Sequence, residues 1–125
     1  MTCQILVVDD DQRTREALVE ILQKAGYEVV SLTSGNGVED LLERYNFSGA
    51  IIDYHLPARN GLEIAVSLRK KLPTCRIILI SSEYKLQSEP FNFTAVDRFL
   101  AKPFSKTALL KTMMELCPLG TSLSG

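Results

Sequence analysis

The sequence lacks tryptophan, has a single histidine, and contains three cysteines that show no C-x-x-C spacing. These residues cannot supply four soft ligands at recognised spacings, which argues against a structural zinc site. An odd number of cysteines without a disulfide-like pattern indicates reduced thiols, so we expect a cytoplasmic protein. Any metal site in this chain is therefore expected to be rich in oxygen ligands.

The sequence also lacks an excess of charge and a long hydrophobic run. Its formal net charge is −1, which gives no reason to expect nucleic acid or an anionic membrane as a direct partner. The apolar stretches have the length of strands, and the first residues do not resemble a secretory signal. With 125 residues, we expect one domain over 1–118 and a flexible tail or start of a linker over 119–125.

Glycine-rich phosphate-binding loops are also missing. No G-x-G-x-x-G, P-loop or G-x-S-x-G motif occurs, which disfavours the common nucleotide-binding folds and the serine hydrolases of that type. The sole histidine, His55, falls in a loop beside Asp53 and forms no plausible Ser-His-Asp set.

The apolar residues alternate between strand-like runs and helical spacing. The runs predict strands over 4–9, 29–32, 49–53, 76–80 and 97–101. Helical spacing predicts one helix that ends at Gly26, a second over about 38–45 with Ser34 as N-cap, a third that stops at Pro73, and a last one from near Ser105.

This alternation predicts an α/β fold in which helices cover both faces of a doubly wound parallel sheet. Five strands at this length favour the flavodoxin-like strand order 2-1-3-4-5. The strand runs are apolar throughout, as burial on both faces requires. Residues 83–96 have weak periodicity and contain Pro90, so we expect a short, displaced or mobile fourth helix there, with Ser88 as a possible N-cap.

Charged and hydroxyl side chains follow four of the predicted strands. Asp9 and Asp10 follow the first strand, Asp53 ends the third, Ser81 follows the fourth, and Lys102 follows the fifth. The carboxyl ends of parallel strands meet at one edge of the sheet, where open α/β sheets bind their ligands. Converging carboxylates repel each other unless a cation is present, and a small oxygen-rich set suits Mg²⁺. The pattern predicts a magnesium site at this edge.

Each of these features has a simpler reading when taken alone. An Asp-Asp pair commonly forms a solvated strand end, and Asp11 fits the N-cap of the first helix. A lysine is most often exposed, although Pro103 favours a rigid turn, with either a cis or a trans bond, that aims Lys102. Ser81 could equally bond to nearby backbone.

Taken together, the residues resemble the receiver domains of two-component response regulators. The matching motifs are VVDD (7–10), IIDYHLPARNG (51–61), ISS (80–82) and AKPF (101–104), and the resemblance covers about residues 4–117. It implies the CheY-like form of the flavodoxin-like fold. It also implies a phosphoacceptor switch that promotes only its own phosphorylation and dephosphorylation, acting in two-component signal transduction.

The resemblance also implies roles for individual residues. Asp53 would accept a phosphoryl group from a histidine kinase or a histidine phosphotransfer protein. Mg²⁺ would be bound by Asp10 and Asp53, by Asp9 through water, and by the backbone carbonyl of His55.

On the phosphate side, Lys102 would contact the phosphoryl oxygens, Ser81 would be the switch hydroxyl, and Phe99 would take the aromatic switch position. An output domain or effector outside this chain, and a phosphorylation-dependent dimer, would complete the signalling.

Three departures from the family pattern fall in one region. Phe99 replaces the more usual tyrosine, Ala95 replaces a common glycine, and Pro90 interrupts the expected fourth helix. These changes leave the mode of dimerisation open.

Two other functions are compatible with parts of the sequence. A pseudo-receiver would be a protein-interaction module that is never phosphorylated, although the acid, hydroxyl and lysine set is complete. A small aspartate-dependent phosphatase could use Asp9-x-Asp11, but Arg13 does not continue that motif.

Overall fold

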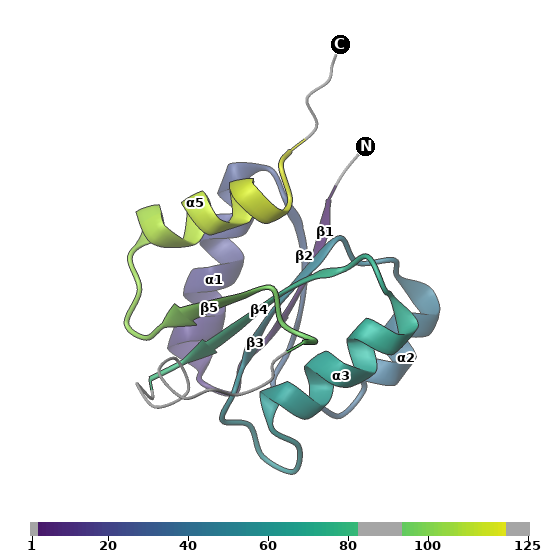
Figure 1. Cartoon of the computed structure of the whole chain (residues 1–125). Helices are drawn as coiled ribbons and strands as arrows, with labels where there is room; N and C mark the ends of the chain where they lie inside the picture. Colours follow the sequence, from purple (N-terminus) through teal and green to yellow (C-terminus); the bar gives the residue numbers. More distant parts are fainter. Residues whose placement is uncertain (1–2, 83–93, 120–125) are drawn as a thin grey trace.

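The computed structural model describes residues 3–82 and 94–119, in which five parallel strands form one sheet (Figure 1). The strands are β1 (Gln4–Val8), β2 (Glu28–Leu32), β3 (Gly49–Asp53), β4 (Arg76–Ser81) and β5 (Arg98–Ala101). The helices in these ranges are α1 (Gln12–Ala25), α2 (Val38–Arg44), α3 (Gly61–Lys71) and α5 (Lys106–Leu116). The strand order is β2-β1-β3-β4-β5, which confirms the predicted topology. None of the helices described is long and apolar enough to cross a membrane.

Alternate residues of the strands build two separate cores. One side of the sheet packs under α2 and α3 and includes Leu6, Val8 and Ile52. The other packs under α1 and α5 and includes Ile5 and Val7. Figure 1 shows α1 and α5 together on one side of the sheet, and α2 and α3 together on the other. This two-sided burial explains why the central strands are apolar at nearly every position.

The two edge strands differ from the expectation of complete burial. Strands β1, β3 and β4 are almost wholly buried, whereas β2 and β5 contain exposed and half-buried residues. An edge strand pairs with one neighbour only, so part of its surface stays open to solvent even in a doubly wound sheet.

Most helix ends follow the local signals in the sequence. Asp11 caps α1 by accepting from the Thr14 N–H, and Ser105 caps α5 in the same way. Gly26 ends α1 at φ 110°, a left-handed conformation that glycine adopts without steric penalty. Asn60 and Glu63 form a capping box at the start of α3.

The prediction that Ser34 caps α2 is wrong. The N-cap is Gly37 at φ 89°, and the Ser34 hydroxyl instead accepts a hydrogen bond from the Asn36 N–H at 3.1 Å. The chain therefore makes an extra turn before the helix, and the serine stabilises that turn. The predicted irregular helix over 83–96, with Ser88 and Pro90, falls largely on residues 83–93, which lie outside the described residues.

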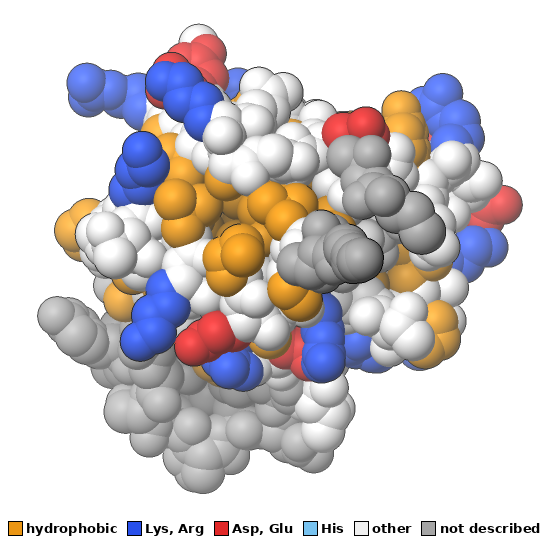
Figure 2. All heavy atoms as spheres, turned by 90° about the horizontal axis from the view of Figure 1, so that it is seen from above, with side chains coloured by type: hydrophobic (Ala, Val, Ile, Leu, Met, Phe, Trp, Pro, Cys, Tyr) orange, Lys and Arg blue, Asp and Glu red, His pale blue; other side chains and the backbone are white. Residues whose placement is uncertain are grey.

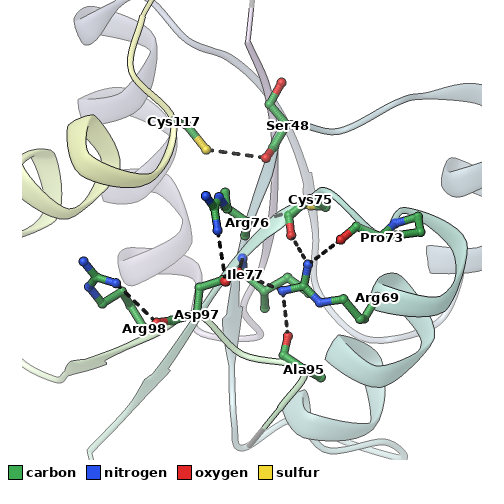
Figure 3. A network of polar contacts seen from close by, with 10 residues as sticks. All are labelled: Ser48, Arg69, Pro73, Cys75, Arg76, Ile77, Ala95, Asp97, Arg98 and Cys117. Carbon is green, nitrogen blue, oxygen red and sulfur yellow. Dashed lines mark hydrogen bonds and ion pairs between the residues drawn. The ribbon is translucent and has the colours of Figure 1, made fainter.

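A network of polar contacts lies at the amino end of the sheet, where β4 and β5 begin (Figure 3). The Arg69 guanidinium donates to the carbonyls of Pro73, Cys75 and Ala95 and to Asp97 Oδ2. The same carboxylate oxygen accepts the Ile77 N–H at 2.8 Å. Burial tends to raise the pKa of Asp97, but these hydrogen bonds and the charge of Arg69 outweigh it, and the pKa is lowered.

The face seen in Figure 2 has hydrophobic side chains at its centre and charged side chains of both signs around its margin. The Tyr27 hydroxyl donates to the Cys117 carbonyl at 2.8 Å, which joins the chain after α1 to the end of α5. Cys3, Cys75 and Cys117 are all free, and burial raises the pKa of the Cys75 and Cys117 thiols to about 12 and about 11. These two thiols therefore remain protonated near neutral pH.

Candidate functional site

Three carboxylates meet at the carboxyl edge of the sheet. Asp9 and Asp10 follow β1, and Asp53 is the last residue of β3, the strand that pairs with β1. One carboxylate oxygen from each residue lies within 4.8 Å of the others. Asp9 and Asp53 are buried, whereas Asp10 is exposed, so the cluster opens to solvent on the side of Asp10.

Asp9 is held in place from two directions. The Asp11 N–H donates to Asp9 Oδ1 at 2.9 Å, and Arg15 Nη1 donates to the Asp9 main-chain carbonyl at 3.0 Å. The second carboxylate oxygen, Oδ2, lies 3.1 Å from Lys102 Nζ, but outside the angles of a hydrogen bond. Burial is the main reason that the pKa of Asp9 is raised, and the contacts with Asp11 and Lys102 only partly offset it.

Lys102 is shared between two carboxylates. Its Nζ lies 3.1 Å from Asp53 Oδ2 and 3.1 Å from Asp9 Oδ2. Burial would lower the pKa of this lysine, but the hydrogen bond and charge of Asp53, followed by the close negative charge of Asp9, raise it. Its backbone is fixed by the Lys102 N–H, which donates to the Ser81 carbonyl at 2.9 Å, and the bond to Pro103 is cis.

Both oxygens of Asp53 have partners. Oδ2 accepts from Lys102, and Oδ1 accepts from the His55 N–H at 3.2 Å. At the main chain of the same residue, a Cβ added at Gly61 would lie only 2.3 Å from the Asp53 carbonyl oxygen. The glycine therefore allows the start of α3 to approach the end of β3 closely.

Ser81 and Phe99 lie on the strands next to the acidic cluster. Ser81 is buried at the end of β4, and its neighbour Ile80 is in register with Asp53. Phe99 lies on β5 opposite Leu79 and packs, half-buried, against the core under α2 and α3. His55 is exposed, and its ring makes an edge-on contact with Tyr54 at a centroid distance of 5.0 Å.

A groove of about 490 Å³ runs beside Lys102. It is lined by Arg13, Thr14, Ala17, Ile21, Ser82, Lys102, Pro103 and Phe104. These residues come from α1, from the end of β4 and from the connection between β5 and α5. The groove therefore places an apolar surface directly next to the cluster of charged groups.

The donor set fits a hard divalent cation. Carboxylate oxygens are the ligands that Mg²⁺ and Ca²⁺ prefer, and two or three carboxylates leave coordination positions for water or a phosphate oxygen. Among the described residues, Asp9 Oδ2 is the buried side-chain oxygen or nitrogen without a hydrogen bond. An oxygen with unused acceptor capacity beside two further carboxylates is what such an ion requires.

Two arginines near the site were not anticipated from the sequence. Arg15 contacts the Asp9 carbonyl, and Arg59 links the loop after β3 to α2 and α3. On a polar helix face or in a loop, an arginine has no spacing signature that separates it from a solvated residue. By contrast, the N-x-x-E spacing of Asn60 and Glu63 could have located the start of α3.

A family model described as the response regulator receiver domain matches residues 5–114 of the chain. Aerobic respiration control protein ArcA of Escherichia coli (strain K12) is 30% identical over 108 residues, which are 86% of this chain and 45% of ArcA. The chain thus spans about half the length of the curated relatives it matches.

Solved structures with the same fold share similar levels of identity. TrrA from Thermotoga maritima, in complex with Mg²⁺-BeF, is 32% identical with a TM-score of 0.83, and the match covers 92% of this chain and 99% of TrrA. A CheY-like receiver domain protein from Methanospirillum hungatei JF-1 is 28% identical with a TM-score of 0.84, covering 92% and 93% of the two chains.

Proposed function

Since the chain belongs to the response regulator receiver domain family of two-component systems, we propose that it accepts a phosphoryl group on Asp53 in a Mg²⁺-dependent reaction. The observation that carries this proposal is the meeting of three carboxylates and one lysine at the carboxyl edge of the sheet. The receiver unit is assigned to residues 1–118, with 119–125 as a tail or start of a linker. The free cysteines fit the reducing cytoplasm as its location.

The proposed reaction transfers the phosphoryl group from a phosphohistidine. An oxygen of Asp53 attacks the phosphorus, the P–N bond to the donor imidazole breaks, and its electron pair returns to the nitrogen. The product is an aspartyl phosphate. Lys102 gives up part of its contact with Asp53 and neutralises the phosphoryl oxygens.

The metal ligands would be Asp9, Asp10, Asp53 and the main-chain carbonyl of His55. When bound, Mg²⁺ supplies positive charge for the phosphoryl oxygens. The His55 N–H keeps Asp53 Oδ1 oriented, and Arg15 keeps the Asp9 backbone in place. The chain therefore contributes mainly positioning and electrostatic stabilisation, so it acts as a phosphoacceptor switch and not as an enzyme with turnover on other substrates.

The groove beside Lys102 is the proposed docking surface of the phosphodonor, a histidine kinase or a histidine phosphotransfer protein. Its apolar residues Ala17 and Ile21 would pack against the donor surface that surrounds the phosphohistidine. Because Lys102 lines the same groove, docking there brings the donor phosphate to the acidic cluster.

The signal is proposed to leave through Ser81 and Phe99. A phosphoryl group on Asp53 would attract the Ser81 hydroxyl, and the half-buried Phe99 would repack in response. An output domain or effector outside this chain, or a phosphorylation-dependent dimer, would then read the change. Unchanged amide NMR shifts around Phe99 after phosphorylation would rule out this part of the proposal.

The central experiment is incubation with Mg²⁺ and a small phosphodonor such as acetyl phosphate, followed by intact-mass analysis. We expect one added phosphoryl group, none in Asp53→Asn, and none when Mg²⁺ is chelated. Absence of any phosphoryl group on the wild type would instead favour a pseudo-receiver. Steady release of phosphate that depends on Asp9 but not on Asp53 would favour a phosphatase.

A further inference from the structure

The loop between β3 and α3, residues 54–60, carries the His55 carbonyl that is proposed to bind Mg²⁺. Its base is closed by the Gly61 N–H, which donates to the Tyr54 carbonyl at 2.8 Å. Its middle contains Ala58 at φ 70°, a left-handed conformation that a residue with a Cβ adopts at an energetic penalty. A loop with such a residue needs contacts elsewhere to keep a single conformation.

Arg59 supplies contacts of this kind. Its Nη1 donates to both carboxylate oxygens of Glu39 on α2 at 3.1 Å, and its Nη2 donates to the Ser67 hydroxyl on α3 at 2.9 Å. The Arg59 side chain is 28% exposed and that of Glu39 is 62% exposed, so the ion pair is open to water, whereas the contact with Ser67 is partly buried. One guanidinium thereby attaches the loop to two helices, which the single ammonium of a lysine would do less well.

We infer that Arg59 is a positioning residue for the Mg²⁺ site, because it holds the loop in the conformation that presents the His55 carbonyl. This inference rests on the proposed function. If Arg59 is removed, the loop spends less of its time in the binding-competent conformation. The apparent dissociation constant for Mg²⁺ then rises by the inverse of that fraction. Loss of groups that orient metal ligands typically weakens affinity at least tenfold, and the closed base of the loop reduces this to roughly three- to tenfold.

The test is a Mg²⁺ titration of the phosphate-free protein, followed by the amide NMR shifts of Asp53 and His55. We expect Arg59→Ala to bind Mg²⁺ roughly three- to tenfold more weakly. Arg59→Lys is expected to fall between Arg59→Ala and the wild type. Urea denaturation confirms that each variant is folded at the titration temperature.

Lys71→Ala is the matched control. It removes the ion pair between Lys71 and Glu43, 2.6 Å apart, which also joins α3 to α2 but does not involve the loop. We expect its affinity for Mg²⁺ to equal that of the wild type.

The kinetic counterpart separates binding from chemistry. With acetyl phosphate, Arg59→Ala should be phosphorylated more slowly at low Mg²⁺ and at the wild-type rate at saturating Mg²⁺. A lower rate at saturating Mg²⁺ would contradict a role confined to the metal site.

The outcomes distinguish the inference from the proposed function. If the wild type does not bind Mg²⁺, the proposed metal site itself is wrong, and the inference falls with it. If the wild type binds and Arg59→Ala binds equally well, only the role of Arg59 is refuted. If Lys71→Ala weakens binding as much as Arg59→Ala, the effect comes from general packing of α2 against α3, and the inference is likewise refuted.

Discussion

Replacing Lys102 by methionine tests whether this lysine stabilises the resting site. Methionine keeps the length of the side chain and its packing in the groove, but removes the ammonium group that lies 3.1 Å from both Asp9 and Asp53. The side chains of Asp9 and Asp53 are 0% and 7% exposed, so the variant leaves two carboxylates buried without their cation.

The expected loss of stability follows from the burial of these groups. Removal of one partner from a fully buried ion pair costs about 3–5 kcal/mol. The Lys102 side chain is 20% exposed, and Asp9, whose pKa is raised, can take up a proton, so we expect about 2–3 kcal/mol in the presence of a chelator near neutral pH.

The pH dependence has a defined sign. The pKa of Lys102 is raised above 10.5, so its contribution is fully present below that value and is lost as the pH rises through the pKa of the folded state. The pKa of Asp9 is already raised in the wild type and should rise further without the lysine. The loss of unfolding free energy in Lys102→Met should therefore become smaller at acidic pH, because Asp9 becomes protonated.

The assay is urea denaturation followed by far-UV circular dichroism between about pH 5 and pH 9. Lys24→Met is the control, because Lys24 and Glu20 form an exposed pair at 3.3 Å that should contribute less than about 1 kcal/mol. Mg²⁺ should stabilise Lys102→Met more than the wild type, since the lysine no longer competes for the same oxygens. A variant as stable as the wild type, with the same response to Mg²⁺, would refute this reasoning.

Two further substitutions test the framework around the site by urea denaturation. Asp97→Asn should cost about 1–2 kcal/mol near neutral pH, because the charge that Arg69 and the Ile77 N–H contact is lost. The pKa of Asp97 is lowered, so the difference in stability between the variant and the wild type should vanish as the pH falls through that pKa. The control is Glu115→Gln, which removes only an exposed ion pair. An equal loss of stability in Glu115→Gln would contradict the prediction. Ala58→Gly should stabilise the protein by about 0.5–1 kcal/mol, since the relief of left-handed strain exceeds the added entropy of the unfolded chain. A less stable glycine variant would show that the conformation of this loop is not strained.

The parts of the fold that the sequence predicts are those set by repeating physical constraints. Unbroken apolar runs identify β1, β3 and β4, because a strand covered on both faces can contain almost nothing else. The start of α2 was predicted wrongly, since Ser34 and Gly37 both suit a helix entrance and only the path of the chain decides between them.

The candidate site shows the same division. The sequence predicts that Asp9, Asp53 and Lys102 lie close together, because parallel strands end at one edge of the sheet. The contacts of Arg15 and Arg59 could not be predicted. Arg15 contacts a main-chain carbonyl, which has no sequence pattern, and Arg59 contacts the carboxylate of Glu39, which is remote in sequence. Long polar side chains gain their roles from tertiary structure, and that information is absent from local spacing.

The pairing of α1 with α5 has a consequence for how the protein is made. One of its two cores is covered by the first helix and by the helix at Lys106–Leu116, joined by the hydrogen bond from Tyr27 to Cys117. During synthesis, Ile5, Val7 and the other apolar residues of that core remain only half covered until the residues of α5 have left the ribosome. The nascent chain therefore exposes an apolar surface to solvent until α5 can pack on it, and a product that is truncated before α5 would be prone to aggregate.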